Sequence, residues 1–439
     1  VRRRGLRRPR RRPPSARTTR CHQLVSSDIS FRAWRTDELG GGTHVGTEPT
    51  DRGLRMAEPV GTRRYTDPHA DVRSDQQTRL TEWSAWVGPA VEPGHAFERL
   101  VPSWNARTPD DSWIELEARV SVDGLGWSRW HSFGCWAETD AEIHRTSRSG
   151  QSVDGSTVRV DVLSARPGLI WTAYQLRLAL HRRVGSTAVP EVSLVGAVVS
   201  TGPADPVGEI DHGGAAHGIE LSVPAYSQQI HRGEYPQWGG GGEAWCSPTA
   251  TSMVLRHWGL GPSEKDYAWV DPGHADRFVD HAAWHVFDYA YGGAGNWSFN
   301  AAYAARYGAE AFVTQLRSLA EAELFIAAGI PLVASVSFTA DELDCAGYDT
   351  AGHLLTIIGF TDDGRVICND PASHERPSND EVRVVFDRAQ FERTWVIGGG
   401  GIVYVVRPHG HPLPELPDPP EPHRPPEPHR PPEPDHRTG

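Results

Sequence analysis

The sequence predicts an all-β sandwich followed by an α+β domain, with disordered segments at both ends. Residues 58–202 hold short alternating apolar stretches separated by turn residues, a pattern typical of antiparallel sandwiches. Residues 219–408 place helical apolar patterns first and strand-like runs afterwards, which is the order of an α+β domain. A Gly- and Pro-rich stretch at 203–218 separates the two parts and is predicted to be a linker.

Length and charge limit the classes of function. The 439 residues suit two or three domains. The net charge is −12, yet residues 1–20 contain ten arginines, so the remainder carries about −22, which is −12 less ten. An acidic body of this kind does not suit nucleic acid binding. Apolar runs stay well short of a membrane span, so neither a nucleic acid partner nor a membrane span is expected.

Both ends of the chain have compositions typical of disorder. Residues 1–57 are rich in Arg, Pro, Ser, Thr and Gly and almost lack periodic apolar residues. They are interpreted as a disordered tail or as translated sequence before a true start at Met56, with a basic nucleic-acid arm as the alternative. A secretory apolar core is missing from this segment, so a cytoplasmic location is the default expectation. Residues 409–439 repeat Pro-Glu-Pro-His-Arg-Pro and predict a solvated polyproline tail.

Strand-like alternation defines the sandwich. The predicted strands are 113–120, 157–162, 174–180 and 192–199, with turns at Asp123-Gly124 and Asp154-Gly155. Eight of the sixteen tryptophans fall between Trp83 and Trp171. We expect most of them to fill the core between two sheets. Trp127 and Trp130 are the expected exposed pair, which would offer a glycan or a peptide ligand a stacking surface.

In the second domain the sequence predicts helices first and strands after them. Helices are predicted at 246–258, 276–291, 298–307 with a Ser298 cap, and 316–328 with a stop at Gly329. Strands are predicted at 331–338, 353–360, 365–370, 382–386 and 401–407. Because the linker precedes all of these elements, residues 215–408 are expected to fold without the sandwich.

Cys246 begins the first of these helices, directly after the glycine run Gly239–Gly242. Pro248 occupies a first-turn position, where its missing N–H costs nothing, and Gly259 ends the helical pattern. Free N–H groups and the helix dipole favour negative charge at this end, so the pKa of this thiol is expected to be lowered. The alternative is a buried and inert cysteine.

A base for this thiol and an orienting group for the base occur together in one predicted hairpin. His353 opens the strand that ends at Phe360, and the return strand ends at Asn369-Asp370-Pro371. Pairing about the turn places Asp370 opposite roughly Ile357, so side-chain reach must cover the offset to His353. A nucleophile, a base and an orienting carboxylate form the set that acyl transfer requires.

Together these motifs resemble the papain-like cysteine peptidases. The resemblance is greatest to the branch that contains bacterial double-glycine leader peptidases and their stand-alone relatives. It covers about residues 219–408, and the matching motifs are Gln228, Cys246-Ser-Pro-Thr, Gly352-His353 and Asp370-Pro371.

The resemblance implies a role for each matching residue. Cys246 would attack the carbonyl, while His353 would hold the thiolate as an ion pair and protonate the leaving amine. Asp370 would orient the imidazole. Gln228 and the backbone N–H of Cys246 would form the oxyanion hole.

Two departures from the family pattern concern this site. Ser247 replaces the usual glycine after the cysteine, and Cys246 lies eighteen positions after Gln228. The long spacing suggests an inserted loop at 231–242 beside the cleft. It also leaves Gln229 and Gln237 as rival oxyanion donors.

The predicted function is hydrolysis of a peptide or protein substrate through a Cys-His-Asp triad, without cofactor or metal. The alternatives are an acyltransferase or cell-wall amidase with the same triad, and an inactive peptide- or glycan-binding protein. The five cysteines form no CxxC pair, which argues against a disulfide framework and a structural zinc. Cys345 and Cys368 lack a helix-start position and are interpreted as a loop residue and a strand-core residue.

Two further groups of residues are weaker candidates. His281 and His285 lie four residues apart on a predicted helix, but they lack a third ligand and are interpreted as surface or packed histidines. Asp341, Asp344 and Asp349 precede His353 and offer a cation or a basic substrate a site, with a solvated loop as the default.

Overall fold

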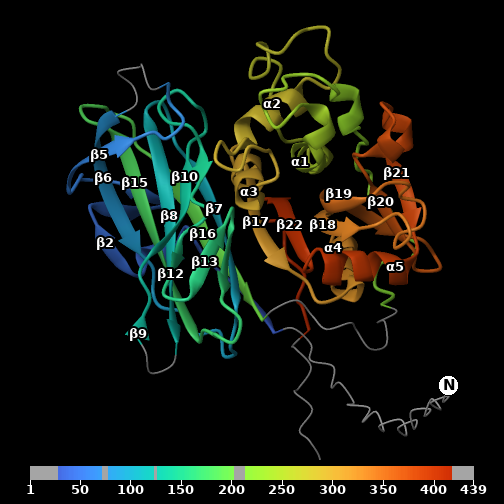
Figure 1. Ribbon diagram of the computed structural model, residues 1–439, viewed down its shortest axis with the longest axis horizontal. Coiled ribbons are helices and arrows are strands. Elements are labelled where there is room, and N and C mark those ends of the chain that lie inside the picture. The colour runs from blue at the N-terminus through green and yellow to red at the C-terminus, as the bar shows by residue number, and fades with distance from the viewer. Residues whose placement is uncertain (1–27, 72–77, 123–125, 202–212, 418–439) are drawn as a thin grey trace, which may run out of the picture.

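A computed structural model of the protein describes residues 28–71, 78–122, 126–201 and 213–417. A sandwich-like β-region lies beside a second part that contains most of the helices (Figure 1). The first 27 residues of the predicted N-terminal tail, most of the predicted linker, the Asp123-Gly124 turn and residues 418–439 lie outside the described residues.

The sandwich-like region consists of two eight-stranded antiparallel sheets. In the first sheet the order is β12 (Ser152–Val153), β13 (Ser156–Arg159), β14 (Val162–Ala165), β7 (Arg99–Arg107), β16 (Glu191–Ser200), β4 (Gly53–Met56) and β3 (Thr47–Thr50), with β1 (Ile29–Arg35) also on β16. In the second the order is β11 (Thr146–Ser147), β10 (His131–Trp136), β8 (Ser112–Val122), β15 (Ala173–Arg183), β6 (Thr78–Val87) and β2 (Thr43–Val45), with β5 (Gly61–Thr66) on β6 and β9 (Gly126–Trp127) on β8.

The predicted disorder of residues 1–57 is wrong for residues 28–57. Strand β1 pairs with β16 from Ile29 opposite Ser200 to Arg35 opposite Leu194. Met56 ends β4 and is buried, so a chain that began there would lack four strands of the sandwich. These strands are short and interrupted by turns. Their stability comes from long-range pairing, which local periodicity does not reveal.

A second difference lies at the predicted strand 157–162, which is a hairpin. Strands β13 and β14 pair with Arg159 opposite Val162, and the chain turns at Val160, where φ is 53°. This turn places Asp161 at the edge of the sandwich that faces the second part of the chain.

Most of the tryptophans of this region are buried in its core, as predicted. Trp127 is exposed, as predicted, and Trp130 is half-buried. The guanidinium of Arg119 lies 4.8 Å from the ring centroid of Trp127 and 4.7 Å from that of Trp130. The tryptophans that are fully buried in the region are Trp86, Trp104, Trp113, Trp136 and Trp171.

The second part is built on one six-stranded antiparallel sheet. Its order is β17 (Ala309–Gln315), β22 (Ile402–Pro408), β18 (Leu332–Phe338), β19 (Thr350–Phe360), β20 (Val366–Asn369) and β21 (Arg383–Phe386). The α-helices are α1 (Cys246–His257), α2 (Phe278–Val286), α3 (Trp297–Ala305), α4 (Leu319–Ala327) and α5 (Arg388–Glu392). The short helical turns of this part are η2 (Gln228–His231), η3 (Gly242–Ala244), η4 (Ser373–Glu375), η5 (Asn379–Glu381) and the π-type η6 (Arg393–Gly398). A further turn, η1 (Glu38–Gly40), lies in the sandwich-like region. Within the described residues, helices of bilayer-spanning length and apolarity do not occur.

Helices cover both faces of this sheet. Along β22, Ile402, Tyr404 and Val406 join an apolar cluster with α1 and α3, whereas Val403 and Val405 join a cluster with α4 and η6. Successive side chains of a strand point to opposite faces, so this alternation places the sheet between two helical layers.

Two local features of the second part differ from the predictions. Strand β17 was not predicted, because it is an edge strand whose buried side chains include Glu310 and Gln315. Helix α3 is capped by Asn296, whose Oδ1 accepts from the Phe299 N–H at 3.1 Å. Ser298 instead donates to a backbone carbonyl of the sandwich, that of Pro102.

The predicted disordered tail at 409–439 is wrong for its first residues. The His411 ring packs against that of Trp258, with centroids 4.9 Å apart, and its Nε2 lies 2.8 Å from the Ala328 carbonyl oxygen. Arg317 donates to the carbonyl of Pro417 at 2.7 Å. Residues 409–417 therefore pack onto the fold, although their composition is typical of a solvated tail.

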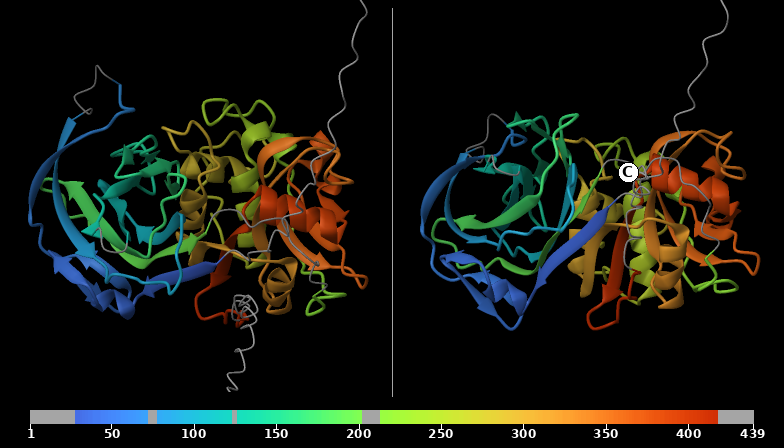
Figure 2. Two further views of the ribbon diagram at one scale, coloured as in Figure 1. Left: turned by 60° about the horizontal axis from the view of Figure 1, so that its bottom comes forward. Right: turned by 90° about the horizontal axis from the view of Figure 1, so that it is seen from below.

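One apolar cluster runs from the sandwich into the second part of the chain. Phe299 of α3 packs against Trp104 and Trp136, with ring centroids 6.0 and 5.1 Å apart. Figure 2 shows α3 and β17 beside the sandwich in both views. The two parts therefore share a core, which argues against the expectation that residues 215–408 fold alone.

Candidate active site

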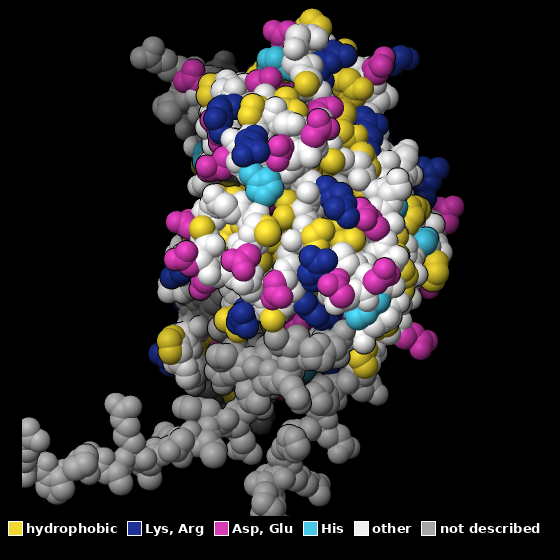
Figure 3. All heavy atoms as spheres, turned by 90° about the vertical axis from the view of Figure 1, so that its right-hand side faces the viewer, with side chains coloured by type: hydrophobic (Ala, Val, Ile, Leu, Met, Phe, Trp, Pro, Cys, Tyr) yellow, Lys and Arg dark blue, Asp and Glu magenta, His cyan; other side chains and the backbone are white. Residues whose placement is uncertain are grey.

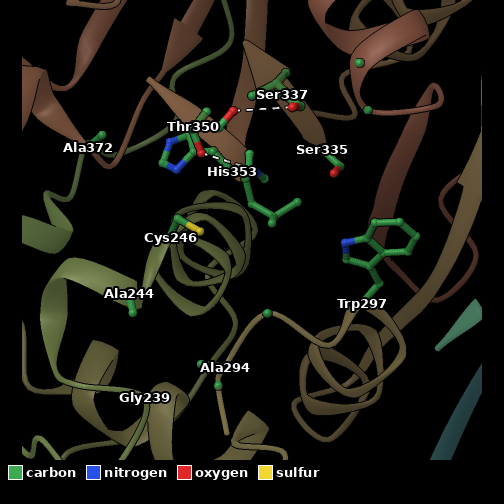
Figure 4. Close-up of a pocket in the computed structure, with 18 of the residues that line it drawn as sticks. Gly239, Ala244, Cys246, Ala294, Trp297, Ser335, Ser337, Thr350, His353 and Ala372 are labelled. Atoms are coloured by element: carbon green, nitrogen blue, oxygen red, sulfur yellow. Dashed lines mark hydrogen bonds between the residues drawn. The ribbon is translucent and has the colours of Figure 1, made fainter. Parts of the chain in front are cut away.

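Cys246 is the first residue of α1 and lies at the floor of a cleft (Figure 4). Its side chain is half-buried, and backbone N–H groups of Ser247 and Leu354 donate to its sulfur. Burial raises the pKa of this thiol, but the charge and the hydrogen bond of His353 outweigh burial, and the pKa lies below its ordinary value. The surroundings of this thiol therefore favour its ionisation relative to a free cysteine.

His353 lies in β19, opposite Val336 of β18, and its ring faces Cys246 (Figure 4). The imidazole is 5% exposed. Burial lowers the pKa of His353, but Asp370 and the Cys246 thiolate outweigh it and raise the pKa to about 10. The pKa of the thiol is lowered and that of the imidazole is raised, which are the directions expected for a thiolate–imidazolium ion pair.

Asp370 directly follows β20 and reaches the far side of the same imidazole. Its Oδ1 lies 2.8 Å from Nε2 of His353 and also accepts from the Ala372 N–H at 2.9 Å. Burial raises the pKa of Asp370, but the charge and hydrogen bond of His353 lower it below its ordinary value. Asn369, one residue earlier, instead donates to the Val223 carbonyl at 3.1 Å. The structure thus brings the three sequence-predicted residues together: His353 hydrogen-bonds Asp370, and its ring faces Cys246 (Figure 4).

Tyr348 is a member of this site that the sequence did not indicate. Its hydroxyl donates to Oδ2 of Asp370 at 2.8 Å, and its ring meets the His353 ring edge-on at 5.6 Å. Both oxygens of the Asp370 carboxylate are therefore held in place. Tyr348 lies in a loop five residues before His353. The apolar pattern of the sequence does not show where a loop side chain points.

The three glutamines considered as oxyanion donors lie in different surroundings. Gln228 is 4% exposed and lines the cleft, where its Nε2 donates one hydrogen to the Glu243 carbonyl at 2.6 Å. The amide retains a second N–H. Gln229 also lines the cleft, but its Oε1 accepts from Arg232 at 2.8 Å. Gln237 is exposed and does not line the cleft.

The cleft has a volume of about 900 Å³ and both parts of the chain line it. Asp161 from the β13–β14 turn accepts from the Trp297 N–H at 2.5 Å, and burial raises its pKa to about 7. Arg99 and Arg159 from the sandwich also line it. The sandwich-like region therefore supplies one wall of the cleft, which the sequence did not suggest.

The two histidines of α2 are packed in the interior. His281 lies 3.0 Å from the Tyr303 hydroxyl, and His285 lies 2.6 Å from the Glu138 carbonyl oxygen. Burial lowers the pKa of His281 to about 3 and that of His285 well below its ordinary value. Neutral, hydrogen-bonded rings of this kind fit the interpretation as packed histidines.

The acidic residues before His353 do not converge on one point. Asp344 hydrogen-bonds Gln390 of α5, and Asp349 accepts from the Ala340 N–H at 2.6 Å. Asp341 is exposed. The carboxylates of Asp344 and Asp349 therefore each serve a separate contact, and Asp341 faces solvent.

The remaining cysteines of the second part lie where the sequence suggested. Cys345 is exposed in the loop, and Cys368 is buried in β20. Burial raises the pKa of the Cys368 thiol, so that group stays protonated.

Acidic and basic side chains are interspersed on the face of the second part that Figure 3 shows. Residues such as Arg376 and Glu381, or Arg383 and Glu220, form exposed ion pairs. Neither sign dominates this face.

Comparison with known proteins agrees with this arrangement. Residues 30–200 match the Peptidase C39 N-terminal domain, and residues 220–402 match the Peptidase_C39 like family. No curated protein matches the chain. Among solved structures, truncated AlyQ with CBM32 and alginate lyase domains matches at 9% identity over 83% of this chain and 77% of that one, with a TM-score of 0.14, which is too low to compare folds. The two family matches lie side by side and together span most of the chain, which makes this protein a relative of the C39 papain-like cysteine peptidases.

Proposed function

We propose that this protein is a cysteine peptidase that hydrolyses peptide bonds through Cys246, His353 and Asp370. The observation that carries the proposal is the placement of the three groups in the cleft, where the His353 ring faces Cys246 and hydrogen-bonds the Asp370 carboxylate at 2.8 Å (Figure 4). The match of residues 220–402 to the Peptidase_C39 like family supports peptide hydrolysis over other uses of the same residues.

The proposed reaction has two halves. The Cys246 thiolate attacks the peptide carbonyl carbon, and the oxyanion accepts hydrogen bonds from its backbone N–H and from the Gln228 amide. His353 gives its proton to the leaving amine as the C–N bond breaks, which leaves a thioester on Cys246. His353 then takes a proton from water, the hydroxide attacks the thioester, and the acid leaves as the thiolate forms again. Asp370 keeps the imidazole oriented throughout.

The test combines a thiol probe with a peptide library. An iodoacetamide probe should label Cys246 at neutral pH, and Cys246→Ala should lose both this label and all cleavage while its circular dichroism stays unchanged. Cys345→Ala is the matched control, because Cys345 is exposed in a loop and should be dispensable for cleavage. Transfer of the acyl group to an added amine without hydrolysis would identify an acyltransferase. Cleavage that survives in Cys246→Ala would overturn the proposal.

A further inference from the structure

Two imidazoles and two carboxylates meet beside α2, outside the cleft that holds Cys246. His231 ends η2, and Glu234 follows it in the inserted loop between Gln228 and Cys246. His274 lies in the loop before α2, and Asp280 lies in the first turn of that helix. Figure 1 shows α2 next to α1 at the upper edge of the second part.

The donor atoms of these four residues face one another at short distances. His231 Nδ1 lies 2.7 Å from Glu234 Oε2 and 3.4 Å from Asp280 Oδ2. His274 Nδ1 lies 3.4 Å from Glu234 Oε2 and 3.5 Å from Asp280 Oδ1. His231, Glu234 and Asp280 therefore hold one ligand atom each within 4.8 Å of one another, and His274 contacts both carboxylates.

Asp280 is the group that most needs a partner. It is fully buried, and neither carboxylate oxygen accepts a hydrogen bond of normal geometry. Nδ1 of His274 is likewise buried and donates no hydrogen bond of that kind. A second carboxylate, that of Glu234, belongs with Asp280 and His231 to a group whose ligand atoms lie within 4.8 Å of one another. Two carboxylates so close together in the interior favour a positive charge between them, which a protonated His231 or a bound cation can supply.

We propose that His231, Glu234, His274 and Asp280 bind a divalent transition-metal ion, most suitably Zn²⁺. Imidazole nitrogens and carboxylate oxygens bind Zn²⁺ at about 2.0–2.2 Å, and ligands in a tetrahedral shell are then about 3.3 Å apart. Three of the known contacts have about that spacing, with His231 and His274 meeting different oxygens of Asp280. The fourth, His231 to Glu234, is a direct hydrogen bond that the ion would replace. One divalent ion balances the charge of the two carboxylates.

The ion would join segments that are far apart in the sequence. His231 and Glu234 belong to the inserted loop, whereas His274 and Asp280 belong to α2 and its approach. Gln228, which lines the cleft, lies in the same short helix as His231. The metal would therefore act as a structural staple that holds the loop before Cys246 against α2. The site does not depend on the proposed peptidase reaction.

The test uses the full chain with Cys246→Ala, which removes the competing thiolate ligand. After purification in metal-free buffer and addition of Zn²⁺, about one equivalent should remain after dialysis, as measured by elemental analysis. Zn²⁺ at about a hundred times its Kd should raise the Tm by about 5 °C. Co²⁺ in the same site should give the visible absorption of a four-coordinate ion, which reports on the ligands without any activity.

Two variants in that background decide the assignment. Asp280→Asn keeps the size of the buried side chain but removes its charge, and it should lose the bound ion and the rise in Tm. His274→Gln alters a half-buried residue and should do the same, which covers a failure of Asp280→Asn to fold. Asp271→Asn changes an exposed residue of the same loop and should retain the ion. The proposal is overturned if the parent chain holds no Zn²⁺, or if His274→Gln and folded Asp280→Asn hold as much as the parent.

Discussion

Nε2 of His353 lies 2.8 Å from Oδ1 of Asp370, although the two residues are not cross-strand partners. The register pairs Asn369 with Thr356, so Asp370 leaves the sheet some way along β19 from His353. Its side chain covers the remaining offset, and the Ala372 N–H and the Tyr348 hydroxyl hold it there. These two hydrogen bonds hold the Asp370 carboxylate at the imidazole.

The first prediction concerns the pH dependence of thiol alkylation. In His353→Ala the thiol keeps its burial, which raises the pKa, and loses the charge that lowers it. The rate at pH 6.5 should fall by up to about a hundredfold, because a thiol with a pKa of about 8.5 is then only about 1% ionised. In Asp370→Asn the pKa of His353, about 10 in the wild type, should fall, so the ion pair is lost at lower pH. Peptide cleavage should drop less in Asp370→Asn than in His353→Ala.

Asn369→Ala is the control for both variants. Asn369 hydrogen-bonds the carbonyls of Val223 and Pro224 and does not contact the imidazole. Its loss should cost about 1–3 kcal/mol of stability and leave the alkylation profile in place. A profile that moves in Asn369→Ala but stays in Asp370→Ala would show that the orienting residue has been assigned to the wrong face of the strand.

Tyr348 is predicted to position Asp370 without touching substrate. Tyr348→Phe keeps the ring against His353 and removes the one hydroxyl that donates to Asp370 Oδ2. A hydrogen bond to a charged group is worth about 1.5–3 kcal/mol, so kcat/KM should fall roughly tenfold. The loss should appear in kcat with KM unchanged, together with a lower pKa of His353 in the alkylation profile. Unchanged kcat would mean that the Ala372 N–H alone suffices to hold the carboxylate.

Gln228 and Gln229 give a matched pair for the oxyanion hole. Gln228→Ala should lower kcat by about 10²–10³, the usual cost of one oxyanion donor. Gln229→Ala should lower kcat much less, since Arg232 holds the Gln229 side chain by its Oε1 and Gln229 is only the rival donor. Alkylation of the thiol forms no oxyanion, so its rate should stay the same in both variants. A larger loss of kcat in Gln229→Ala than in Gln228→Ala would exchange the two assignments.

The spacing of apolar residues along the sequence predicted the helix and the strands that carry the three proposed catalytic residues. The start of α1 at Cys246 follows from Pro248 and apolar spacing, and β19 and β20 follow from continuous apolar runs. Apolar periodicity is a property of the nearest residues, so one sequence reveals it.

Features that depend on distant partners were missed. Strand β1 depends on pairing with β16, more than 150 residues away, and Tyr348 acquires its role only where the loop folds back on Asp370. The cluster of His231 and Asp280 has no recognisable ligand spacing, since a loop and a helix bring its members together. Such contacts are set by tertiary structure and leave no mark on local periodicity.

The second part of the chain depends on the sandwich for its edge strand as well as for its core. Asn105 of β7 exchanges two hydrogen bonds with the backbone of Ala311, at 2.6 and 3.1 Å, and Ser103 accepts from the Val313 N–H at 2.8 Å. These side chains pair the free edge of β17, which otherwise would expose unpaired backbone groups. Phe299 adds a large apolar contact at the same interface.

The last prediction is therefore that residues 213–439 do not fold when they are expressed alone. Without the sandwich, the edge of β17 and the apolar face of α3 meet water, and the short chain should aggregate or bind a hydrophobic dye. Within the full chain, Phe299→Ala should destabilise both parts together by about 3–5 kcal/mol, in a single unfolding transition. The measurements are the soluble fraction of the short chain and thermal unfolding of the full chain, with exposed Trp127→Ala as the control. A soluble short chain with wild-type alkylation kinetics would mean that the shared core is dispensable for the site.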